Sequence, residues 1–420
     1  MRVLYIGDRR AGGIAGHVKC LTECLPSDVE RYVIGIGGDE PFAGRNGHDI
    51  REFFQIRRVI REFKPDVVHF NAPVLFMAFY VKIVRLFDLR LFDCLIGGHR
   101  KSNNRGSKNQ TIAVICSWHT PTNHPPSMGQ RLFFRLLGED CYYLPVSTPT
   151  WEGLRQWLPS ARGEVFFNSI NLSTFQPFNL STFQPFNLTV GMVGRNADQK
   201  DWPAFHRVEE LVKGKVSRFQ GFKVSGFQGF KVSEFQGFKV SEFQGFKVSG
   251  FQGFKVSEFQ GFKVSGLQGL NLPRTNQSNN QTISNQTISS VDFLNAGEKS
   301  TCDGREAIAK MDLFVMTSKH EELPTTVLEC FALGTPVCGF IPVGGMSDIL
   351  KFSTGPLREV FIAERSCEKL ADIVMDLLAH PEKRQALIED GRRILENHFD
   401  AEKNCRGRLM EIYEKCTAWG

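Results

Sequence analysis

Short apolar runs alternate with longer amphipathic segments through the first 165 residues, and the alternation restarts near residue 188. The apolar runs have the length and residue types of buried strands, whereas the amphipathic segments have the spacing of helices. Strands that alternate with helices predict parallel sheets with helices on both faces. In the first half, the expected strands are Val3–Ile6, Arg31–Gly37, Asp66–Phe70, Ile112–Ser117 and Tyr142–Val146, and the expected helices are Gly16–Leu25, Ile50–Phe63, Val74–Phe87 and Thr150–Trp157.

The second half follows the same rule and ends in helices. Its expected strands are Thr189–Val193, Val291–Leu294, Leu313–Met316 and Pro336–Ile341, and its expected helices are Trp202–Val212, Gly304–Lys310, a helix from Pro324 to Gly334, Cys367–Ala379, Glu382–Asn397 and Ala401–Lys415. We therefore predict an α/β fold with two doubly wound, Rossmann-like domains. Residues 1–165 and 189–395 form the domains, 166–188 the linker between them, and 396–420 a C-terminal helical segment.

Three tandem repeats interrupt this pattern. Residues 219–266 hold six copies of FQGFKVS followed by Gly or Glu, residues 171–186 repeat NLSTFQPF twice, and residues 280–289 repeat NQTIS twice. The octanucleotide TTTCAAGG, read in frame through three copies, encodes FQGFKVSR, and AACCTTTC encodes NLSTFQPF in the same way. We therefore interpret the repeats as expanded short DNA sequences, with residues 219–290 inserted into the second domain.

A functional binding array is the alternative interpretation of the repeats. The eight-residue period lies below the roughly 20–50 residues of usual repeat folds, which favours incidental expansion. An even period nevertheless keeps each side chain on a fixed face of a strand, so this sequence can form stacked strands. Apolar strands without proline also carry an aggregation risk wherever they pair between molecules.

Composition is that of an ordinary globular protein. The 420 residues carry a net charge of +6, with 23% charged and 41% hydrophobic residues, and suffice for two domains. The eleven cysteines form no CxxC pair and mostly lie in apolar runs, so we expect reduced thiols in a cytoplasmic protein. We expect no signal peptide and no membrane span, because every long apolar stretch is interrupted by charges. No basic run interleaved with aromatics predicts nucleic-acid binding.

The run from Val315 to Phe340 carries the strongest chemical signal. It predicts a strand, a polar loop with Glu321, a helix that begins near Pro324 and contains Glu329, and a stop at Gly334. Proline suits the first helical turn, and glycine suits the position after the last. Parallel sheets bind ligands beyond the carboxyl ends of their strands, so both carboxylates can face one ligand. The free N–H groups at the helix start suit a phosphate.

This constellation resembles the Glu-x7-Glu motif of the retaining glycosyltransferases of family 4, which have the two-domain GT-B fold. The flanking residues strengthen the resemblance, since Ser318 precedes the pair while Gly334-Thr335-Pro336 and Gly344-Gly345 follow it. The resemblance implies that the second domain binds a nucleotide sugar. It also implies that the last helix packs back across the first domain, which would bind the acceptor.

Further motifs support the same resemblance. Arg195 and Lys200 follow an expected strand in a segment similar to the family's Gly-Arg…Lys-Gly, and two cations there could converge on a diphosphate. Gly12 and Gly13 resemble its N-terminal glycine loop. His119 follows a buried strand at a place where the family has a histidine that contacts the donor sugar. A structural loop histidine is the alternative for His119.

The resemblance implies a role for each residue of the central motif. Glu329 would accept hydrogen bonds from ribose hydroxyls, and Glu321 would contact the donor sugar. Thr325 and Thr326, at the helix start, would offer N–H and hydroxyl groups to the distal phosphate. Glu322 stands where many relatives carry glycine. No Asp-x-Asp motif occurs, so we expect catalysis by positioning and charge stabilisation, with no metal and no cofactor.

We therefore predict a glycosyltransferase of surface polysaccharide or glycolipid biosynthesis. It would move a sugar from a nucleotide-diphosphate donor to a glycan or lipid-linked acceptor, with retention of configuration. Basic residues beside apolar faces, at Arg58, Arg61, Lys82, Arg85 and Arg90 and in His99–Lys108, suit peripheral contact with the inner face of a membrane. A solvated charged face explains the same residues equally well.

Two other functions were weighed against this prediction. A non-catalytic or misfolded, repeat-expanded relative of such an enzyme is favoured by the interruption at 219–290 and disfavoured by the intact motif residues. A nicotinamide-dependent dehydrogenase is disfavoured because the first strand is not followed by Gly-x-Gly-x-x-Gly with a downstream acid.

Overall fold

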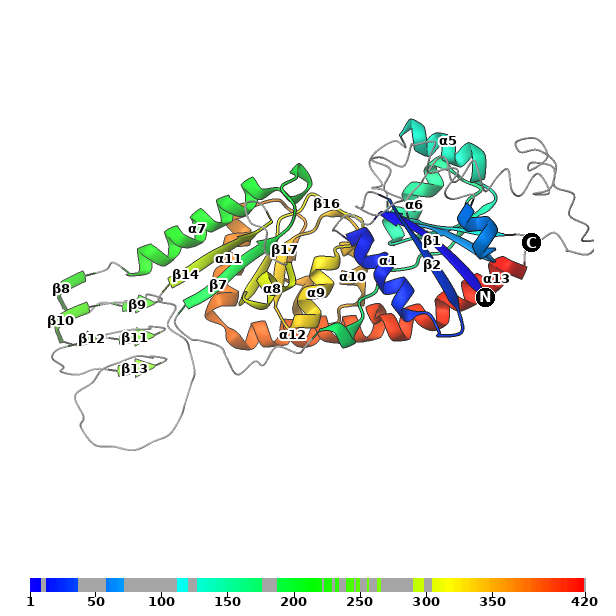
Figure 1. Cartoon of the computed structure of the whole chain (residues 1–420). Coiled ribbons are helices and arrows are strands. Elements are labelled where there is room, and N and C mark those ends of the chain that lie inside the picture. Colours follow the sequence, from blue (N-terminus) through cyan, green and yellow to red (C-terminus); the bar gives the residue numbers. More distant parts are fainter. Residues whose placement is uncertain are drawn as a thin grey trace, which may run out of the picture.

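The computed structural model describes residues 1–8, 13–36, 58–71, 112–119, 127–175, 187–220, 290–297 and 304–418, together with short strands between residues 223 and 265. Gly12 and the helix expected at Val74–Phe87 lie outside the described residues, as does the basic stretch His99–Lys108. The described residues form two α/β domains, each built on its own parallel sheet (Figure 1).

The first domain is built on a six-stranded parallel sheet with the order β2-β1-β3-β4-β5-β6. The strands are β1 (Arg2–Asp8), β2 (Glu30–Ile36), β3 (Val67–Phe70), β4 (Ala113–Trp118), β5 (Cys141–Pro145) and β6 (Arg162–Gly163). Its helices include α1 (Gly13–Cys24), α5 (Met128–Leu137) and α6 (Thr148–Trp157). The sequence analysis missed α5, although a Ser127–Gln130 capping box opens it.

The second domain is built on a five-stranded parallel sheet with the order β14-β7-β15-β17-β19. The strands are β7 (Asn187–Val193), β14 (Ser290–Ala296), β15 (Leu313–Met316), β17 (Val337–Phe340) and β19 (Phe361–Ile362), and the helices are α7 (Trp202–Gln220), α8 (Gly304–Ala309), α9 (Thr325–Leu333), α10 (Met346–Phe352) and α11 (Cys367–Ala379). A separate two-stranded pair joins β16 (His320–Glu321) to β18 (Val343–Gly344). The predicted α/β architecture with two doubly wound domains is confirmed.

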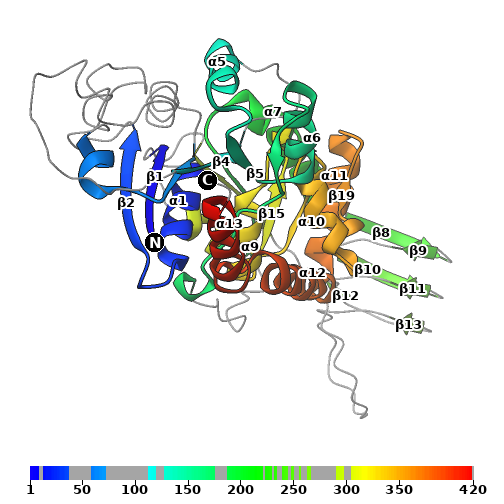
Figure 2. The same cartoon turned by 90° about the vertical axis from the view of Figure 1, so that its right-hand side faces the viewer.

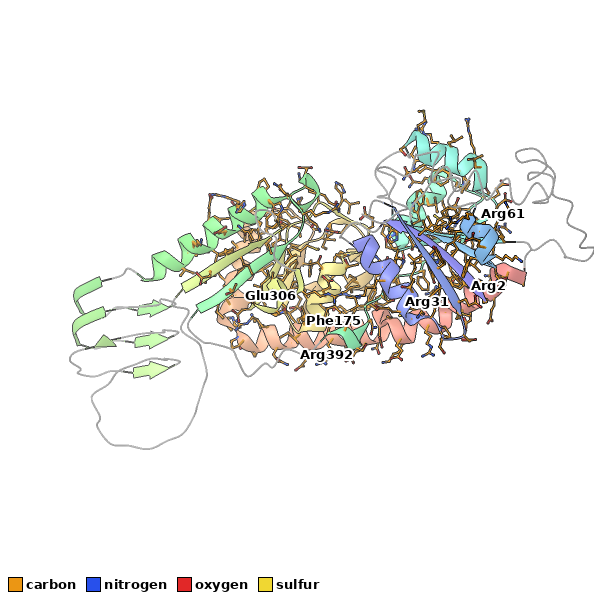
Figure 3. The ribbon with its side chains drawn as sticks, viewed as in Figure 1. Arg2, Arg31, Arg61, Phe175, Glu306 and Arg392 are labelled. Atoms are coloured by element: carbon orange, nitrogen blue, oxygen red, sulfur yellow. The ribbon has the colours of Figure 1, made fainter. Side chains whose placement is uncertain are left out.

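The two faces of the first sheet are packed by different elements, because side chains alternate along each strand. Leu4 and Ile6 belong to one buried cluster, together with residues of α6. Val3 and Tyr5 belong to the cluster on the opposite face, together with residues of the C-terminal helix. Side chains fill the layers of both domains (Figure 3).

The C-terminal segment connects the two domains. Helix α12 (Pro381–Ile394) packs against α9 and α11 of the second domain. Two π-helical turns lead from it to α13 (Gly407–Ala418), whose Leu409 and Tyr413 are fully buried against the first sheet. Figure 1 shows α12 and α13 running along one side of both domains. The described residues contain no helix with the length and apolarity to span a bilayer.

The described strands of the repeat pair in two parallel ladders, β8-β10-β12 and β9-β11-β13, beside the second domain (Figure 2). They are β8 (Lys223–Gln228), β9 (Lys231–Ser233), β10 (Lys239–Gln244), β11 (Lys247–Ser249), β12 (Lys255–Val256) and β13 (Lys263–Ser265). Lys239 is paired with Lys223 and with Lys255, so each strand skips the adjacent copy of the repeat and pairs with the copy after it. The unit that stacks is therefore two copies of the repeat rather than one. Incidental expansion of the DNA stays a prediction.

Candidate functional site

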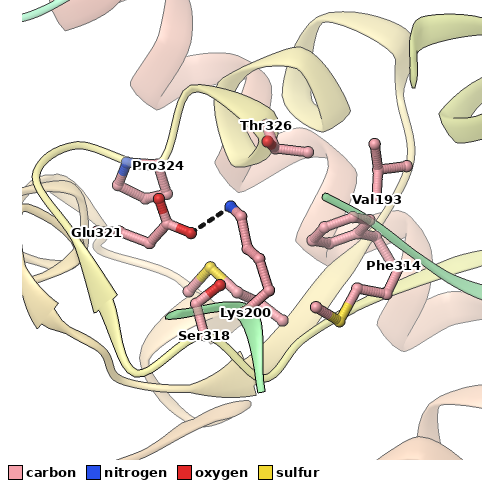
Figure 4. Close-up of a pocket in the computed structure, with 9 residues that line it drawn as sticks. Val193, Lys200, Phe314, Ser318, Glu321, Pro324 and Thr326 are labelled. Carbon is pink, nitrogen blue, oxygen red and sulfur yellow. Dashed lines mark hydrogen bonds and ion pairs between the residues drawn. The ribbon is translucent and has the colours of Figure 1, made fainter. Parts of the chain in front are cut away.

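A buried ion pair lies beyond the carboxyl ends of the central strands of the second domain. Lys200 Nζ donates to Glu321 Oε1 at 2.5 Å, and the two side chains are only 15% and 10% exposed. The pair lines a small pocket together with Met192, Val193, Phe314, Met316, Ser318, Pro324 and Thr326 (Figure 4). This is the edge of a parallel sheet at which ligands bind.

Local backbone geometry holds both members of the pair. Lys200 ends a short 3-10 turn after β7, and Asp201 then takes a left-handed conformation with φ 54° before α7 begins. Glu321 lies in β16, whose backbone pairs with Gly344. A Cβ at Gly344 would lie 1.9 Å from the Glu321 carbonyl oxygen, and its φ is +126°, so only glycine fits there.

Arg365 fixes the loops that carry Lys200 and Glu321. Arg365 Nη2 donates to Asp201 Oδ2 at 2.5 Å and to the Thr317 carbonyl at 2.6 Å, and Nη1 donates to the Ser318 carbonyl at 3.1 Å. Arg365 was not predicted from the sequence, since it follows the motif by some forty residues and no local pattern marks it. Its role is to position the loops that carry Lys200 and Glu321.

The other residues of the second domain that were expected at the site differ in how close they lie to this pocket. Thr325 and Thr326 are the first residues of α9, and Thr326 lines the pocket. Arg195 is exposed beside it, and its carbonyl accepts a hydrogen bond from Trp202 Nε1 at 3.1 Å. Burial raises the pKa of Glu322, with a further rise from the Glu321 charge and an opposing effect of Lys200 and Arg195.

Glu329 does not line the pocket of Glu321. Its Oε1 lies 3.5 Å from Arg305 Nε, and the Arg305 guanidinium stands 4.3 Å from the ring centroid of Phe175, which Figure 3 labels. Glu329 and Glu321 therefore face different parts of the α9 region. Neither Arg305 nor Phe175 was expected from the sequence to contribute here.

Two histidines lie together at the carboxyl edge of the first sheet. His119 directly follows β4, and its ring packs against that of His17 in α1, with 5.0 Å between the centroids. Burial lowers the pKa of His119 to about 4. Gly13 is the first residue of α1, at the same edge. The sequence analysis did not single out His17. Among the described residues, no three metal-ligating side chains gather into a metal site.

The two domains meet through a carboxylate that caps a helix of the other domain. Asp348, on α10, is 2% exposed, and its Oδ2 accepts a hydrogen bond from Thr148 N in the first turn of α6 at 2.6 Å. Gly345 lies directly beside this contact, because a Cβ there would lie 2.9 Å from Ser147 Cβ. The carboxylate therefore satisfies an N–H group at the helix start and complements its partial positive charge.

Replacing Asp348 with alanine is expected to lower the free energy of unfolding by about 1–2 kcal/mol, the range for a lost helix cap. Urea unfolding of the purified variant measures this change. Lys351→Ala is the matched control, because it removes only the exposed partner of Asp348, 3.3 Å away, and leaves the contact between the domains. Equal stability of Asp348→Ala and the parent protein would show that the cap does not hold the domains together.

Part of the sequence of the second domain is similar to known glycosyltransferases. Residues 276–394 match the family of glycosyl transferases group 1. A segment of 131 residues is 27% identical to TuaC of Bacillus subtilis, a protein named as a teichuronic acid biosynthesis glycosyltransferase. That segment is 31% of this chain, and it spans about a third of the relative, 32% of its length.

Solved structures share the fold over the whole chain. Anabaena HepE, in complex with UDP-glucose, superposes with a TM-score of 0.59 at 12% identity, covering 99% of this chain and 100% of that one. The sucrose-phosphate synthase of Thermosynechococcus elongatus gives a TM-score of 0.57 at 14% identity and covers 100% of both chains. The chain therefore has the GT-B fold of two α/β domains, as the sequence predicted.

Proposed function

We propose that this chain, whose residues 276–394 match the glycosyl transferases group 1 family, transfers a sugar from a nucleotide-diphosphate donor to a glycan or lipid-linked acceptor. The observation that carries the proposal is the buried ion pair of Lys200 and Glu321, placed beside the N-terminus of α9. A cation and a helix start next to each other form a site for an anion, and a nucleotide diphosphate is the anion that such an α/β sheet accommodates.

The charges around the pocket suit the departure of a nucleoside diphosphate. Lys200 is already held in position by Glu321, so it needs no reorganisation when negative charge develops on the leaving phosphate. Arg195 is exposed at the same edge and can close on the distal phosphate. Thr325 and Thr326 would add N–H groups from the first turn of α9. Glu321 would accept a hydrogen bond from a hydroxyl of the donor sugar on its second carboxylate oxygen while Oε1 stays on Lys200.

We further propose that the reaction retains the anomeric configuration and needs no metal. The residues around the pocket can stabilise the leaving group through cations and N–H donors alone, which is the chemistry expected of the Glu-x7-Glu motif. His119 would contact the donor sugar from the first domain. Glu329, now 3.5 Å from Arg305, would exchange that contact for the ribose hydroxyls.

The acceptor is proposed to be a growing surface polysaccharide or a glycolipid. The name of one similar protein supports this class, since TuaC is named for teichuronic acid biosynthesis. The acceptor would enter along the carboxyl edge of the first sheet, where His17 and His119 lie. A cytoplasmic location at the inner face of a membrane would suit a lipid-linked acceptor.

Thermal unfolding with added nucleotides tests the donor site. A nucleotide that binds only the native protein raises the free energy of unfolding by about 2.7 kcal/mol at a hundredfold excess over its dissociation constant. We expect UDP or GDP, and the corresponding nucleotide sugars, to raise the melting temperature, whereas the nucleosides without phosphates should not. No increase with any nucleotide would contradict the proposed function.

A deletion variant separates the donor site from the repeat. Removing residues 221–289 joins the end of α7 to the start of β14, and the seven paired residues of β14 and β7 remain. We expect the same nucleotide-induced increase in this variant. An increase confined to the variant would mean that the insertion blocks an otherwise competent site.

A further inference from the structure

A chain of buried side-chain hydrogen bonds crosses the first domain from the C-terminal helix to the carboxyl edge of the sheet. Tyr413 Oη lies 2.7 Å from Tyr5 Oη and 2.7 Å from His69 Nδ1. His69 Nε2 lies 2.8 Å from Ser117 Oγ, which lies 3.3 Å from His17 Nε2. All five residues are at most 3% exposed. The chain ends at His17, whose Nδ1 is buried and has no hydrogen-bond partner within the part of the protein that the structure describes.

The hydrogen bonds of this network can all be donated in one direction or in the other. Each hydroxyl and each neutral imidazole has one proton to donate. Burial lowers the pKa of His69 to about 3 and that of His17 well below its ordinary value, so both rings are neutral near pH 7. If every group donates toward His17, the ring proton of His17 lies on Nδ1. If every group donates toward Tyr5, the phenol proton of Tyr5 has no acceptor among the described residues.

Burial decides between the two directions. Tyr5 is 0% exposed in the middle of the sheet, where an O–H group without an acceptor is costly and no ligand can reach it. Donation toward His17 leaves only a lone pair unused at the Tyr5 end and places the unpaired donor at the His17 end, where a ligand can accept from it. The one unpaired donor is then His17 Nδ1–H, at the end of the chain nearest the ligand-binding edge.

The surroundings of His17 suit a ligand. Helix α1 begins just after β1, so His17 lies at the carboxyl edge of the first sheet. The ring of His119 packs against it at an interplanar angle of 73°, and His119 Nε2 is buried with no hydrogen-bond partner among the described residues. Buried polar atoms are almost always paired, so a ring nitrogen on each of these two neighbouring side chains is suited to a polar ligand.

We propose that His17 is a substrate-binding residue whose Nδ1–H donates to a sugar hydroxyl oxygen, and that Tyr413, His69 and Ser117 are positioning residues that set its tautomer. The assignment rests on the proposed function for the nature of the ligand. It makes α13 part of the site, because the hydrogen bonds of Tyr413 connect this C-terminal helix to the carboxyl edge of the first sheet. A sugar hydroxyl accepts a hydrogen bond from the ring and remains free to donate its own proton.

Nitrogen-15 NMR of histidine-labelled protein reads the tautomers directly. We expect the Nδ1–H tautomer for His17 and the Nε2–H tautomer for His69, with His17→Gln and His69→Gln providing the assignments. Ser117→Ala should release His17 from the Nδ1–H tautomer, and Ser117→Thr, which keeps the hydroxyl, should restore it. An Nε2–H tautomer for His17 in the parent protein would overturn the proposed direction of the chain. This readout needs no ligand, so it does not depend on the proposed function.

The ligand is tested on the same resonance. UDP-glucose and UDP are compared first, followed by UDP together with methyl α-glucoside as an acceptor mimic. A shift of His17 Nδ1 with UDP-glucose alone identifies a donor hydroxyl, and a shift only with the glucoside identifies an acceptor hydroxyl. His17→Gln should then bind the effective sugar about tenfold more weakly, as for one lost hydrogen bond, while UDP binding is unchanged. If UDP-glucose stabilises the protein but neither UDP-glucose nor UDP with the glucoside shifts the His17 resonance, the assignment is overturned.

Discussion

Replacing Lys200 with methionine is expected to abolish sugar transfer and to destabilise the protein at the same time. The substitution keeps the apolar stem and removes the ammonium group, so Glu321, 10% exposed, becomes a buried carboxylate without its partner. Breaking a buried pair from one side costs about 3–5 kcal/mol. Loss of a positioned charge at the leaving group should lower kcat by about 10²–10³-fold. Urea unfolding and a transfer assay with the nucleotide sugar measure the two effects.

The double variant Lys200→Met/Glu321→Gln separates stability from chemistry. It removes both charges, so no buried ion is left unpaired, and most of the lost stability should return. Transfer should remain abolished, since the cation is still missing. Lys319→Met is the matched control, because Lys319 pairs with exposed Asp198 nearby at 2.6 Å and such a pair contributes less than about 1 kcal/mol. Recovery of transfer in the double variant would show that Lys200 acts only by holding the fold.

The strand-helix unit around Glu321 could be predicted closely because its signals are local. Strand β15 occupies the expected residues Leu313–Met316, and α9 begins after Pro324 and ends at Gly334, whose φ is +75°. An apolar run of strand length, a proline at the helix start and a glycine after its end are signals carried by residues that are neighbours in the chain. They can therefore be recognised in a single sequence. The helix Cys367–Ala379 was likewise predicted at its exact bounds.

Contacts between distant segments could not be predicted in the same way. Arg365 reaches the carbonyls of Thr317 and Ser318, and Asp348 caps α6 of the other domain, but neither residue has a local pattern that names its partner. His17 is one of ten histidines in the sequence, and only its place in the hydrogen-bonded chain distinguishes it. The helix α7 extends to Gln220, beyond the expected end at Val212, because Val216 is buried in the core of the second domain and Gly214 alone does not end the helix.

The stability of the protein is expected to fall steeply between about pH 6.5 and pH 4, because three histidines of the first domain have lowered pKa values in the folded state. Burial lowers the pKa of His119 to about 4, that of His69 to about 3, and that of His17 well below its ordinary value. In the unfolded chain each ring binds a proton below about pH 6.5. Unfolding therefore takes up protons in this window, and acid favours the unfolded state.

Unfolding that takes up three protons at about pH 5 lowers the free energy of unfolding by about 4 kcal/mol for each pH unit of acidification. Since a domain is stable by only about 5–15 kcal/mol, this loss is enough to unfold the protein at moderately acid pH. Burial raises the pKa of Glu322, Asp312 and Asp400, so these groups bind protons first in the folded state and moderate the loss at the acid end. Urea unfolding at several pH values gives the number of protons from the slope. His17→Gln should lower that number by one, whereas a stability independent of pH across the window would mean that the three rings are already protonated in the folded protein.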